Sequence, residues 1–289
     1  PKMNLKNDGA RKWALDVTEY WIKNFDIDGW RMDVAKELDF SFWKDFRDIA
    51  LNAKKDVVLI SEIFGDTSQW LQGDRFDGTM NYSFRETMID FFATKRINNK
   101  EFANSLSNLF SMYSFEALSS CQNLLSSHDV RRFLNQCESN TDGIYGAVFL
   151  QATFPGIAGI YYGDEIGLGG GGDPFNREPF PWDSEDKWNK ELMEFTTDLM
   201  NIKIGEPILK YGHFQMIKFD DDYVIFRRKL NNESLLCIVN RDKRKRDIEI
   251  ETKAENVELI YGECSIELNS GNLILKDLAD NFGFIIKEI

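Results

Sequence analysis

The segment from Ile27 to Met32 constrains the fold most, because it is a short, apolar-flanked run that leads directly into ionisable residues. Such a run is typical of a buried strand, and the ionisable residues at its end are Arg31, Asp33, Lys36 and Glu37. In parallel α/β proteins the chemistry lies at the carboxyl ends of the strands. Arg31 and Asp33 are two residues apart, so on a strand they share one face, where Arg31 favours the ionised form of Asp33. A purely structural ion pair fits the same pattern.

Two further apolar runs also end next to an acid. Val57–Ile60 precedes Glu62, and Leu124–Leu125 precedes Asp129. Helical patterns separate these runs, and such an alternation of strands and helices predicts a parallel sheet. Helices are expected over residues 8–25, 42–53 (with Ser41 as the N-cap), 82–94, 100–110, 143–153 and 188–204, and the remaining strands over 76–81 and 156–162.

The sequence pattern changes after about residue 205, where short strand-like runs alternate with polar turns. This pattern predicts an antiparallel β-sandwich. Its strands are expected over residues 214–219, 223–228, 234–239, 247–250, 257–260, 273–275 and 284–286. We therefore predict an α/β domain over residues 1–204 and a C-terminal β-sandwich domain over residues 205–289.

Composition argues against several classes of protein. A net charge of −13 disfavours nucleic acid, whose phosphates require a basic face. No apolar run is long enough to predict a membrane span, and no signal peptide is visible. The four cysteines have neither metal-like nor paired spacing, so reduced thiols and a cytoplasmic location are expected. The histidines are His128 and His213, without a His-x-x-x-His pair, which disfavours a zinc site.

The three strand-end acids suit the hydrolysis of a glycosidic bond. That reaction uses two carboxyl groups, one as nucleophile and one as proton donor. The donor must be protonated, and apolar neighbours such as Ile60, Ile63 and Phe64 would favour the protonated form of Glu62. Metal ligation is a competing use of three carboxylates and stays open at this point.

Three short segments carry a resemblance to a known family. GWRMDVAKE, SEIFGD and SSHDVRR resemble the second, third and fourth conserved regions of the α-amylase family of retaining α-glucan hydrolases. The resemblance implies that Asp33 is the nucleophile, with Arg31 beside it, and that Glu62 is the general acid/base. It also implies that Asp129 is the third acid, which binds sugar hydroxyls and stabilises the transition state, with His128 next to it.

Longer segments narrow the resemblance to the cyclomaltodextrinase, neopullulanase and maltogenic amylase subgroup. They are residues 66–92 and 154–183, and the second includes Asp173 and Arg177, which the resemblance puts near the donor-side sugar sites. Tyr82 is a further candidate for substrate contact, although core packing is the commoner role of an aromatic residue. The subgroup usually has Ala-Asn-Glu after the nucleophile, whereas here Lys36–Glu37 follows an alanine, as in the wider α-amylase family. Lys36 and Glu37 are expected to bind substrate, and the acceptor-side preference stays open.

The resemblance implies a fold and an activity. The fold is the C-terminal part of a (β/α)8 TIM barrel, from its fourth to its eighth strand, followed by the β-sandwich. The activity is retaining hydrolysis of α-1,4-glucosidic bonds in maltooligosaccharides, cyclodextrins or related α-glucans. The alternatives are a transglycosylase, an α-1,6-active relative, or an inactive glucan-binding or structural fragment. No cofactor and no metal site are expected; calcium occurs in the family but is not indicated, because the segments that commonly supply its ligands are not in this sequence.

The family's first conserved region and the first three barrel strands would precede residue 1, so the chain is expected to be a fragment. The strands at 27–32 and 156–162 would then be the edges of an open barrel, and open edges of apolar parallel strands promote association. A second copy, as a homodimer, or the missing N-terminal part is expected to cover them.

The first prediction concerns this polypeptide by itself. Residues 1–289 should be inactive on maltotriose and cyclodextrin, because the family's first-region residues are not in the sequence. The test is to purify the chain, measure its mass in solution and assay both substrates. A folded monomer with turnover like that of the family would contradict the prediction.

Overall fold

The computed structural model describes residues 3–138, 140–269 and 271–289. Contacts divide the chain into two compact units. The first contains the residues up to Ser83 together with Met112–Gln122, and the second contains Phe84–Ser111 and Asn123–Ile289. The predicted domain boundary at 204/205 falls inside the second unit, at the end of a helix over Lys190–Gly205. The two predicted domains, 1–204 and 205–289, stay a prediction.

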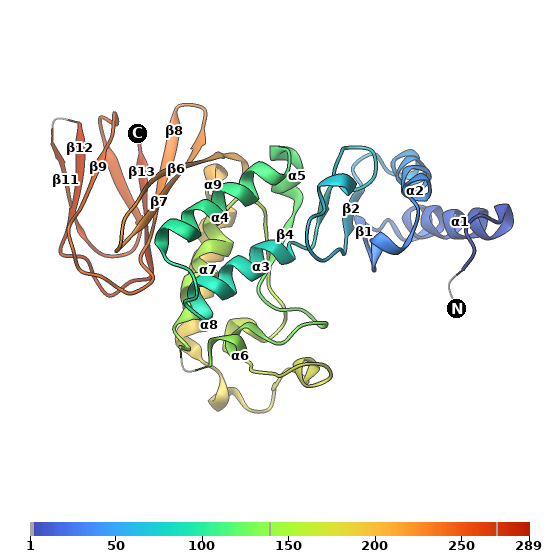
Figure 1. Cartoon of the computed structure of the whole chain (residues 1–289), viewed down its shortest axis with the longest axis horizontal. Coiled ribbons are helices and arrows are strands. Elements are labelled where there is room, and N and C mark those ends of the chain that lie inside the picture. The colour runs from blue at the N-terminus through green and yellow to red at the C-terminus, as the bar shows by residue number, and fades with distance from the viewer. Residues whose placement is uncertain (1–2, 139, 270) are drawn as a thin grey trace. The chain divides into compact units, whose positions relative to one another are not determined.

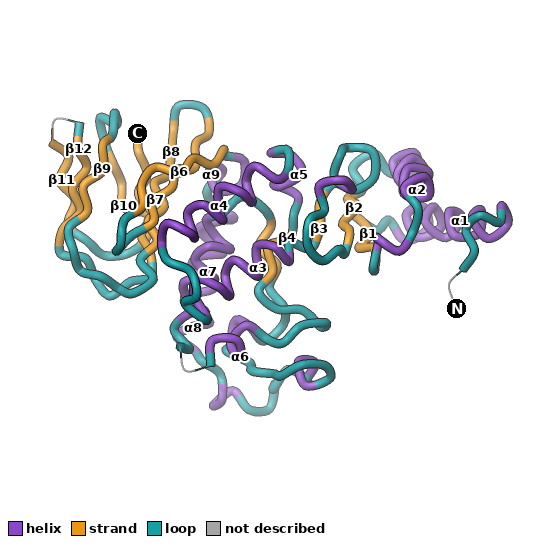
Figure 2. The backbone as a smooth tube through the Cα atoms, in the orientation of Figure 1, coloured by secondary structure: helices purple, strands orange, loops and turns teal. Residues whose placement is uncertain are grey.

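The first unit is built on a parallel sheet with the strand order β1–β2–β3. Figure 1 labels β1 and β2, and Figure 2 labels all three strands. Its elements are α1 (Asp8–Phe25), β1 (Gly29–Met32), the 3-10 turn η1 (Ala35–Glu37), α2 (Phe40–Ala53), β2 (Val58–Ser61), the 3-10 turn η2 (Ser68–Trp70), β3 (Gly78–Thr79) and α5 (Phe115–Ser120). The helices α1 and α2 pack against each other. The aromatic side chains that α2 buries include Phe42, Trp43 and Phe46.

Capping residues define where the first two helices begin. Asn7 caps α1, since its side chain accepts a hydrogen bond from the Ala10 amide at 3.0 Å. The prediction that Ser41 caps the second helix was wrong. The helix begins at Phe40, and Asp39 is the cap, because its carboxylate accepts from the Ser41 amide at 2.8 Å. An aspartate is at least as good an N-cap as a serine, and the hydrogen-bond geometry selects it here.

The parallel strands are shorter than the sequence pattern suggests. The strand expected from Ile27 begins at Gly29, which lies so close to β2 that a Cβ atom there would be 2.4 Å from the Val58 carbonyl oxygen. The strand expected over 76–81 is shorter, as β3, although the Asp77 amide still donates to the Leu59 carbonyl at 2.9 Å. The carboxylate of Asp77 accepts from the Leu59 amide at 2.8 Å. A side chain thus satisfies a backbone donor at this point of β2.

The second unit contains two kinds of structure. Its first part has α3 (Tyr82–Met88, which begins at the end of the first unit), the π-helical segment η3 (Ile89–Ala93), α4 (Asn99–Met112), β4 (Gln122–Leu124), α6 (Phe133–Cys137), α7 (Gly143–Thr153), β5 (Ile157–Gly159), the 3-10 turns η4 (Asp164–Ile166), η5 (Phe175–Arg177) and η6 (Glu185–Lys187), α8 (Lys190–Gly205) and α9 (Pro207–Tyr211). The strands β4 and β5 pair with each other. The short helix α6 was not predicted, and β5 is shorter than the expected strand over 156–162.

The second part consists of two antiparallel sheets, drawn in orange in Figure 2. One has the order β10–β13–β8–β7–β6 and the other the order β11–β12–β9. The strands are β6 (His213–Phe219), β7 (Val224–Leu230), β8 (Glu233–Val239), β9 (Ile248–Glu251), β10 (Val257–Tyr261), β11 (Ser265–Asn269), β12 (Asn272–Lys276) and β13 (Gly283–Glu288). Both sheets contribute to one apolar core, for example Ile225 and Ile286 from the first and Ile250 and Leu273 from the second. The strand β11 was not predicted.

Two buried cations contact the end of α7, and one of them, Arg228, links it to the antiparallel sheets. The ammonium of Lys203, on α8, donates to the Ala152 carbonyl at 3.0 Å. Arg228, on β7, donates from Nη1 to the Thr153 carbonyl at 2.6 Å. The last carbonyls of a helix lack partners within the helix and attract positive charge. Burial lowers the pKa of Lys203 to about 7 and that of Arg228 to about 10. Removing the two charges from water thus costs free energy.

Among the described residues, no helix has both the length and the apolar content needed to cross a membrane. All four cysteines are free. Burial raises the pKa of Cys121, Cys137 and Cys237 to about 12, which keeps these thiols protonated and unreactive.

The buried carboxylate of Glu288 lies at one end of the two antiparallel sheets. Glu288, which is 5% exposed, accepts from Arg227 Nε at 2.7 Å and Nη2 at 2.9 Å. It also accepts from the hydroxyl groups of Ser234 and Thr252, each at 2.6 Å. Burial by itself raises the pKa of Glu288, but the hydrogen bonds from these three side chains outweigh it and hold the pKa below its ordinary value.

This network predicts loss of stability in acid. Because the pKa of Glu288 is lower in the folded state, its stabilising contribution is present above the unfolded-state value of about 4.3 and is lost as the pH falls through the folded-state pKa. Glu288→Gln should flatten this pH dependence and cost roughly 3 kcal/mol at neutral pH, since Arg227 loses its counter-charge. Urea unfolding at several pH values measures both effects. Glu267→Gln, at a partly exposed pair with Lys276, is the matched control and should change little. An unchanged pH profile in Glu288→Gln would contradict the prediction.

Candidate active site

The parallel register of β1 and β2 brings two of the predicted catalytic acids to one edge of the sheet. Met32 lies opposite Ser61, so Asp33 and Glu62 are the next residue of each strand. The backbone then continues the pairing, because the Glu62 amide donates to the Met32 carbonyl at 2.9 Å and the Ala35 amide donates to the Glu62 carbonyl at 3.1 Å. The predicted nucleophile and the predicted proton donor are therefore neighbours within the first unit.

Arg31 holds both carboxylates. Its Nη1 atom donates to Asp33 Oδ1 at 2.8 Å, and its Nη2 atom forms an ion pair with Glu62 Oε1. The guanidinium fork offsets the repulsion that two neighbouring carboxylates would otherwise exert. The guanidinium carries one positive charge, so it offsets part of the negative charge of the two acids.

The backbone directly after Asp33 is strained at Val34. Val34 has φ 43° and ψ 47°, a left-handed conformation that β-branched residues rarely adopt. In this conformation the Val34 amide donates to Glu62 Oε2 at 3.2 Å. From α2, the indole of Trp43 donates to the Ala35 carbonyl at 2.8 Å and fixes the following turn. Strain of this kind persists where the surrounding contacts determine the conformation.

The two carboxyl groups have different surroundings. The side chain of Asp33 is 73% exposed, which suits a group that attacks a substrate, whereas that of Glu62 is 3% exposed. The expectation of an apolar environment for Glu62 was right only in part. Ile63 is buried, but Phe64 is largely exposed and the cation of Arg31 contacts Glu62 directly.

Other predicted substrate-binding residues of the first unit surround this edge. Lys36 and Glu37 lie in the turn η1, shortly after the predicted nucleophile Asp33, and both are exposed. Tyr82 is buried, with one face of its ring stacked on Phe64 at a centroid distance of 3.8 Å. A substrate contact of Tyr82 stays a prediction, and the exposed member of this aromatic pair is Phe64.

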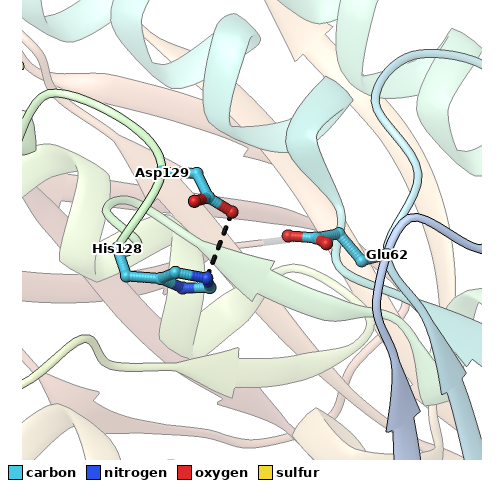
Figure 3. Close-up of side chains that lie close together, drawn as sticks. All are labelled: Glu62, His128 and Asp129. Atoms are coloured by element: carbon cyan, nitrogen blue, oxygen red, sulfur yellow. Dashed lines mark ion pairs between the residues drawn. The ribbon is translucent and has the colours of Figure 1, made fainter. Parts of the chain in front are cut away.

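The third acid lies in the second unit, in the loop that follows β4. His128 Nε2 lies 3.2 Å from Asp129 Oδ2, as Figure 3 shows with a dashed line. Arg177 approaches the other carboxylate oxygen, with Nη2 3.4 Å from Asp129 Oδ1, and its Nε pairs with Asp173 at 2.8 Å. The predicted residues His128, Asp129, Asp173 and Arg177 thus form one connected charged group.

A residue that sequence reasoning missed supports this group. Asn176 is fully buried, and its amide nitrogen lies within hydrogen-bond distance of the carbonyls of Ser127, His128 and Val130. The sequence signal is weak, since it is only an asparagine next to Arg177 in a predicted loop.

A buried Arg–Asp pair lies next to the same loop. Arg132 Nη1 contacts Asp164 Oδ1 at 3.1 Å and donates to the Tyr162 carbonyl at 2.8 Å, and its guanidinium lies over the rings of Tyr161 and Tyr162. Burial raises the pKa of Asp164 to about 7, which exceeds the lowering effect of Ser126 and Arg132. The pair ties the start of α6 to the segment after β5.

The contacts of Arg31 predict its contribution to stability. Arg31→Met should lower the free energy of unfolding by roughly 2 kcal/mol, less than for a fully buried pair, because the Arg31 side chain is 34% exposed. The loss arises because Glu62 stays buried without its cation. Urea unfolding measures it, and the double variant Arg31→Met/Glu62→Gln should recover part of the loss. A single variant as stable as the original chain would show that the ion pair contributes nothing.

The chain matches known proteins along most of its length. Residues 1–197 match the family model described as Alpha amylase, catalytic domain. A cyclomaltodextrinase from Thermoanaerobacter pseudethanolicus is 36% identical over 287 residues, which cover 99% of this chain and 49% of that protein. Neopullulanase 2 from Thermoactinomyces vulgaris is 36% identical over 250 residues, covering 86% of this chain and 42% of that protein.

The whole chain also superposes on a solved structure. The debranching enzyme of Nostoc punctiforme superposes with a TM-score of 0.90 at 30% identity, covering 100% of this chain and 63% of that one. Of the curated relatives named above, the chain spans about half the length. These matches confirm the resemblance read from the sequence motifs, and the chain belongs to the α-amylase family.

Proposed function

We propose that this chain carries the catalytic acids of a retaining α-glucan hydrolase. The observation that supports this most is the bridge made by Arg31 between Asp33 and Glu62 at one edge of a parallel sheet, in a chain that belongs to the α-amylase family. The substrates would be maltooligosaccharides, cyclodextrins or related α-glucans with α-1,4 bonds. Relatives named cyclomaltodextrinase and maltogenic α-amylase support this choice.

The reaction would proceed in two displacements. The carboxylate of Asp33 attacks the anomeric carbon and forms a covalent glycosyl ester, while Glu62 gives its proton to the glycosidic oxygen and the aglycone leaves. A water molecule then attacks the same carbon, Glu62 takes its proton, and Asp33 is released. Asp129, with His128 and Arg177 beside it, would bind sugar hydroxyls and stabilise the transition state. The mechanism requires no cofactor.

We further propose that residues 1–204 correspond to the fourth to eighth strands of a (β/α)8 barrel and that residues 205–289 form a β-sandwich. The parallel order β1–β2–β3, the pair β4–β5 and the common core of the two antiparallel sheets support this assignment. A relative named intracellular maltogenic amylase supports a cytoplasmic location. We also propose that a second copy of the chain, or further polypeptide, covers the edge of β1.

Activity on α-1,6 bonds is the second candidate. The matched structures include a debranching enzyme and a cyclic α-maltosyl-(1→6)-maltose hydrolase, the latter with a TM-score of 0.85 at 28% identity. The two candidates differ in their products. Release of panose from pullulan indicates cleavage of α-1,4 bonds, whereas release of maltotriose indicates cleavage of α-1,6 bonds.

The assigned roles predict distinct variants in an active protein that contains this chain. Asp33→Asn should abolish turnover with the fold intact, because it removes the nucleophile's charge. Glu62→Gln should slow hydrolysis of natural glucans by about 10²–10⁴-fold but spare aryl glycosides, whose leaving groups need less protonation. Steady-state assays on both substrate types measure this difference. Equal losses on the two types would remove the acid/base assignment from Glu62.

A further inference from the structure

The loop from Leu125 to Arg132, which carries His128 and Asp129, is held by side chains from outside it. On one side Arg85, a buried residue of α3, donates from Nε to the Leu125 carbonyl and from Nη2 to the Arg131 carbonyl, each at 2.8 Å. The two ends of the loop are thereby fixed. The middle of the loop needs other donors, because a buried carbonyl without a partner is costly.

Asn176 supplies these donors for the middle of the loop. Its amide nitrogen lies 2.8 Å from the His128 carbonyl oxygen, 3.0 Å from that of Val130 and 3.3 Å from that of Ser127. An amide group has two N–H bonds, so the three carbonyls share them. These carbonyls belong to residues that flank Asp129 in sequence, so Asn176 contacts the backbone on both sides of it.

The segment around Asn176 is itself fixed against the loop. The adjacent residue, Arg177, donates from Nε to the same His128 carbonyl at 2.9 Å. The Arg132 amide donates to the Gly170 carbonyl at 3.1 Å. Gly170 packs so closely that a Cβ atom there would lie 2.9 Å from the Cα of Asn176. The glycine-rich segment over 169–172 thus allows Asn176 to approach the loop.

We propose that Asn176 is a positioning residue for the His128–Asp129 pair and that it acts through the backbone of their loop. Its donors hold the three carbonyls in one arrangement, while Arg177 contacts the carboxylate itself. The expected effect of Asn176 on catalysis rests on the proposed function, whereas its effect on the conformation of the loop does not. The two adjacent side chains share the His128 carbonyl, but Arg177 also contacts the carboxylate of Asp129, whereas the amide nitrogen of Asn176 contacts backbone carbonyls.

The substitution Asn176→Asp tests the claim with almost no change of shape. A carboxylate accepts hydrogen bonds and donates none, so three carbonyl oxygens would face an acceptor in a buried site. Asn135→Asp on α6 is the matched control. The side-chain oxygen of Asn135 accepts from the Gly170 amide, and an aspartate keeps that acceptor while it adds the same charge to the same unit.

The readout is the NMR spectrum of the histidine rings in the purified chain, together with hydrogen exchange of the loop amides. The sequence has two histidines, so His213 on β6 reports on the fold while His128 reports on the loop. We expect Asn176→Asp to move the His128 signal and to speed exchange over residues 126–131, with His213 unchanged. Asn135→Asp should leave both histidine signals in place. An unmoved His128 signal with unchanged exchange in Asn176→Asp would overturn the proposal, as would the same response in both variants.

Two further measurements keep the test decisive. If Asn176→Asp loses the His213 signal as well, Asn176→Ser takes its place, because a serine hydroxyl retains one donor and should give a smaller displacement of His128; no displacement would overturn the proposal. In an active protein that contains this chain, Asn176→Asp should lower kcat on the order of 10²-fold with a smaller change in KM. An inactive parent protein would count against the proposed function, whereas the NMR result judges the positioning role independently.

Discussion

The pairing of β1 with β2 is the constraint on which the candidate site depends. Because Met32 and Ser61 are in register, the residues that follow them leave the sheet together, and the fork of Arg31 can contact both Asp33 and Glu62. The left-handed backbone at Val34 and the indole of Trp43 then fix the turn between the strand and α2. A shift of register by one residue would reverse the faces of β1 and separate Arg31 from both acids.

In the second unit, buried side-chain donors have a similar structural role. They bind backbone carbonyls that lie in a loop or at the end of a helix. Arg85 and Asn176 satisfy the carbonyls of the loop that carries Asp129. Lys203 and Arg228 do the same for the last carbonyls of α7. In each case a polar side chain takes the place of a missing secondary-structure partner, as buried backbone groups require. The electrostatic cost appears in the lowered pKa values of Lys203 and Arg228.

Membership of the α-amylase family gives these arrangements a chemical meaning. The exposed carboxylate of Asp33 and the buried one of Glu62 are the kind of pair that a nucleophile and a proton donor need. Arg31 contacts both carboxylates, so a change at this one residue would alter the surroundings of both proposed catalytic acids.

The sequence by itself determined most of the order of elements, the family and the positions of Asp33 and Glu62 directly after strands, because apolar periodicity and local motifs are short-range signals. It also predicted most strands of the two antiparallel sheets, but not β11, although Ile266 and Leu268 alternate with polar residues there. Only the tertiary structure decided that Asp39 rather than Ser41 caps α2, that Arg31 contacts Glu62, and that Asn176 holds the loop of Asp129. Each of these depends on hydrogen-bond geometry or on atoms from segments distant in sequence, and neither composition nor spacing encodes which donor meets which acceptor.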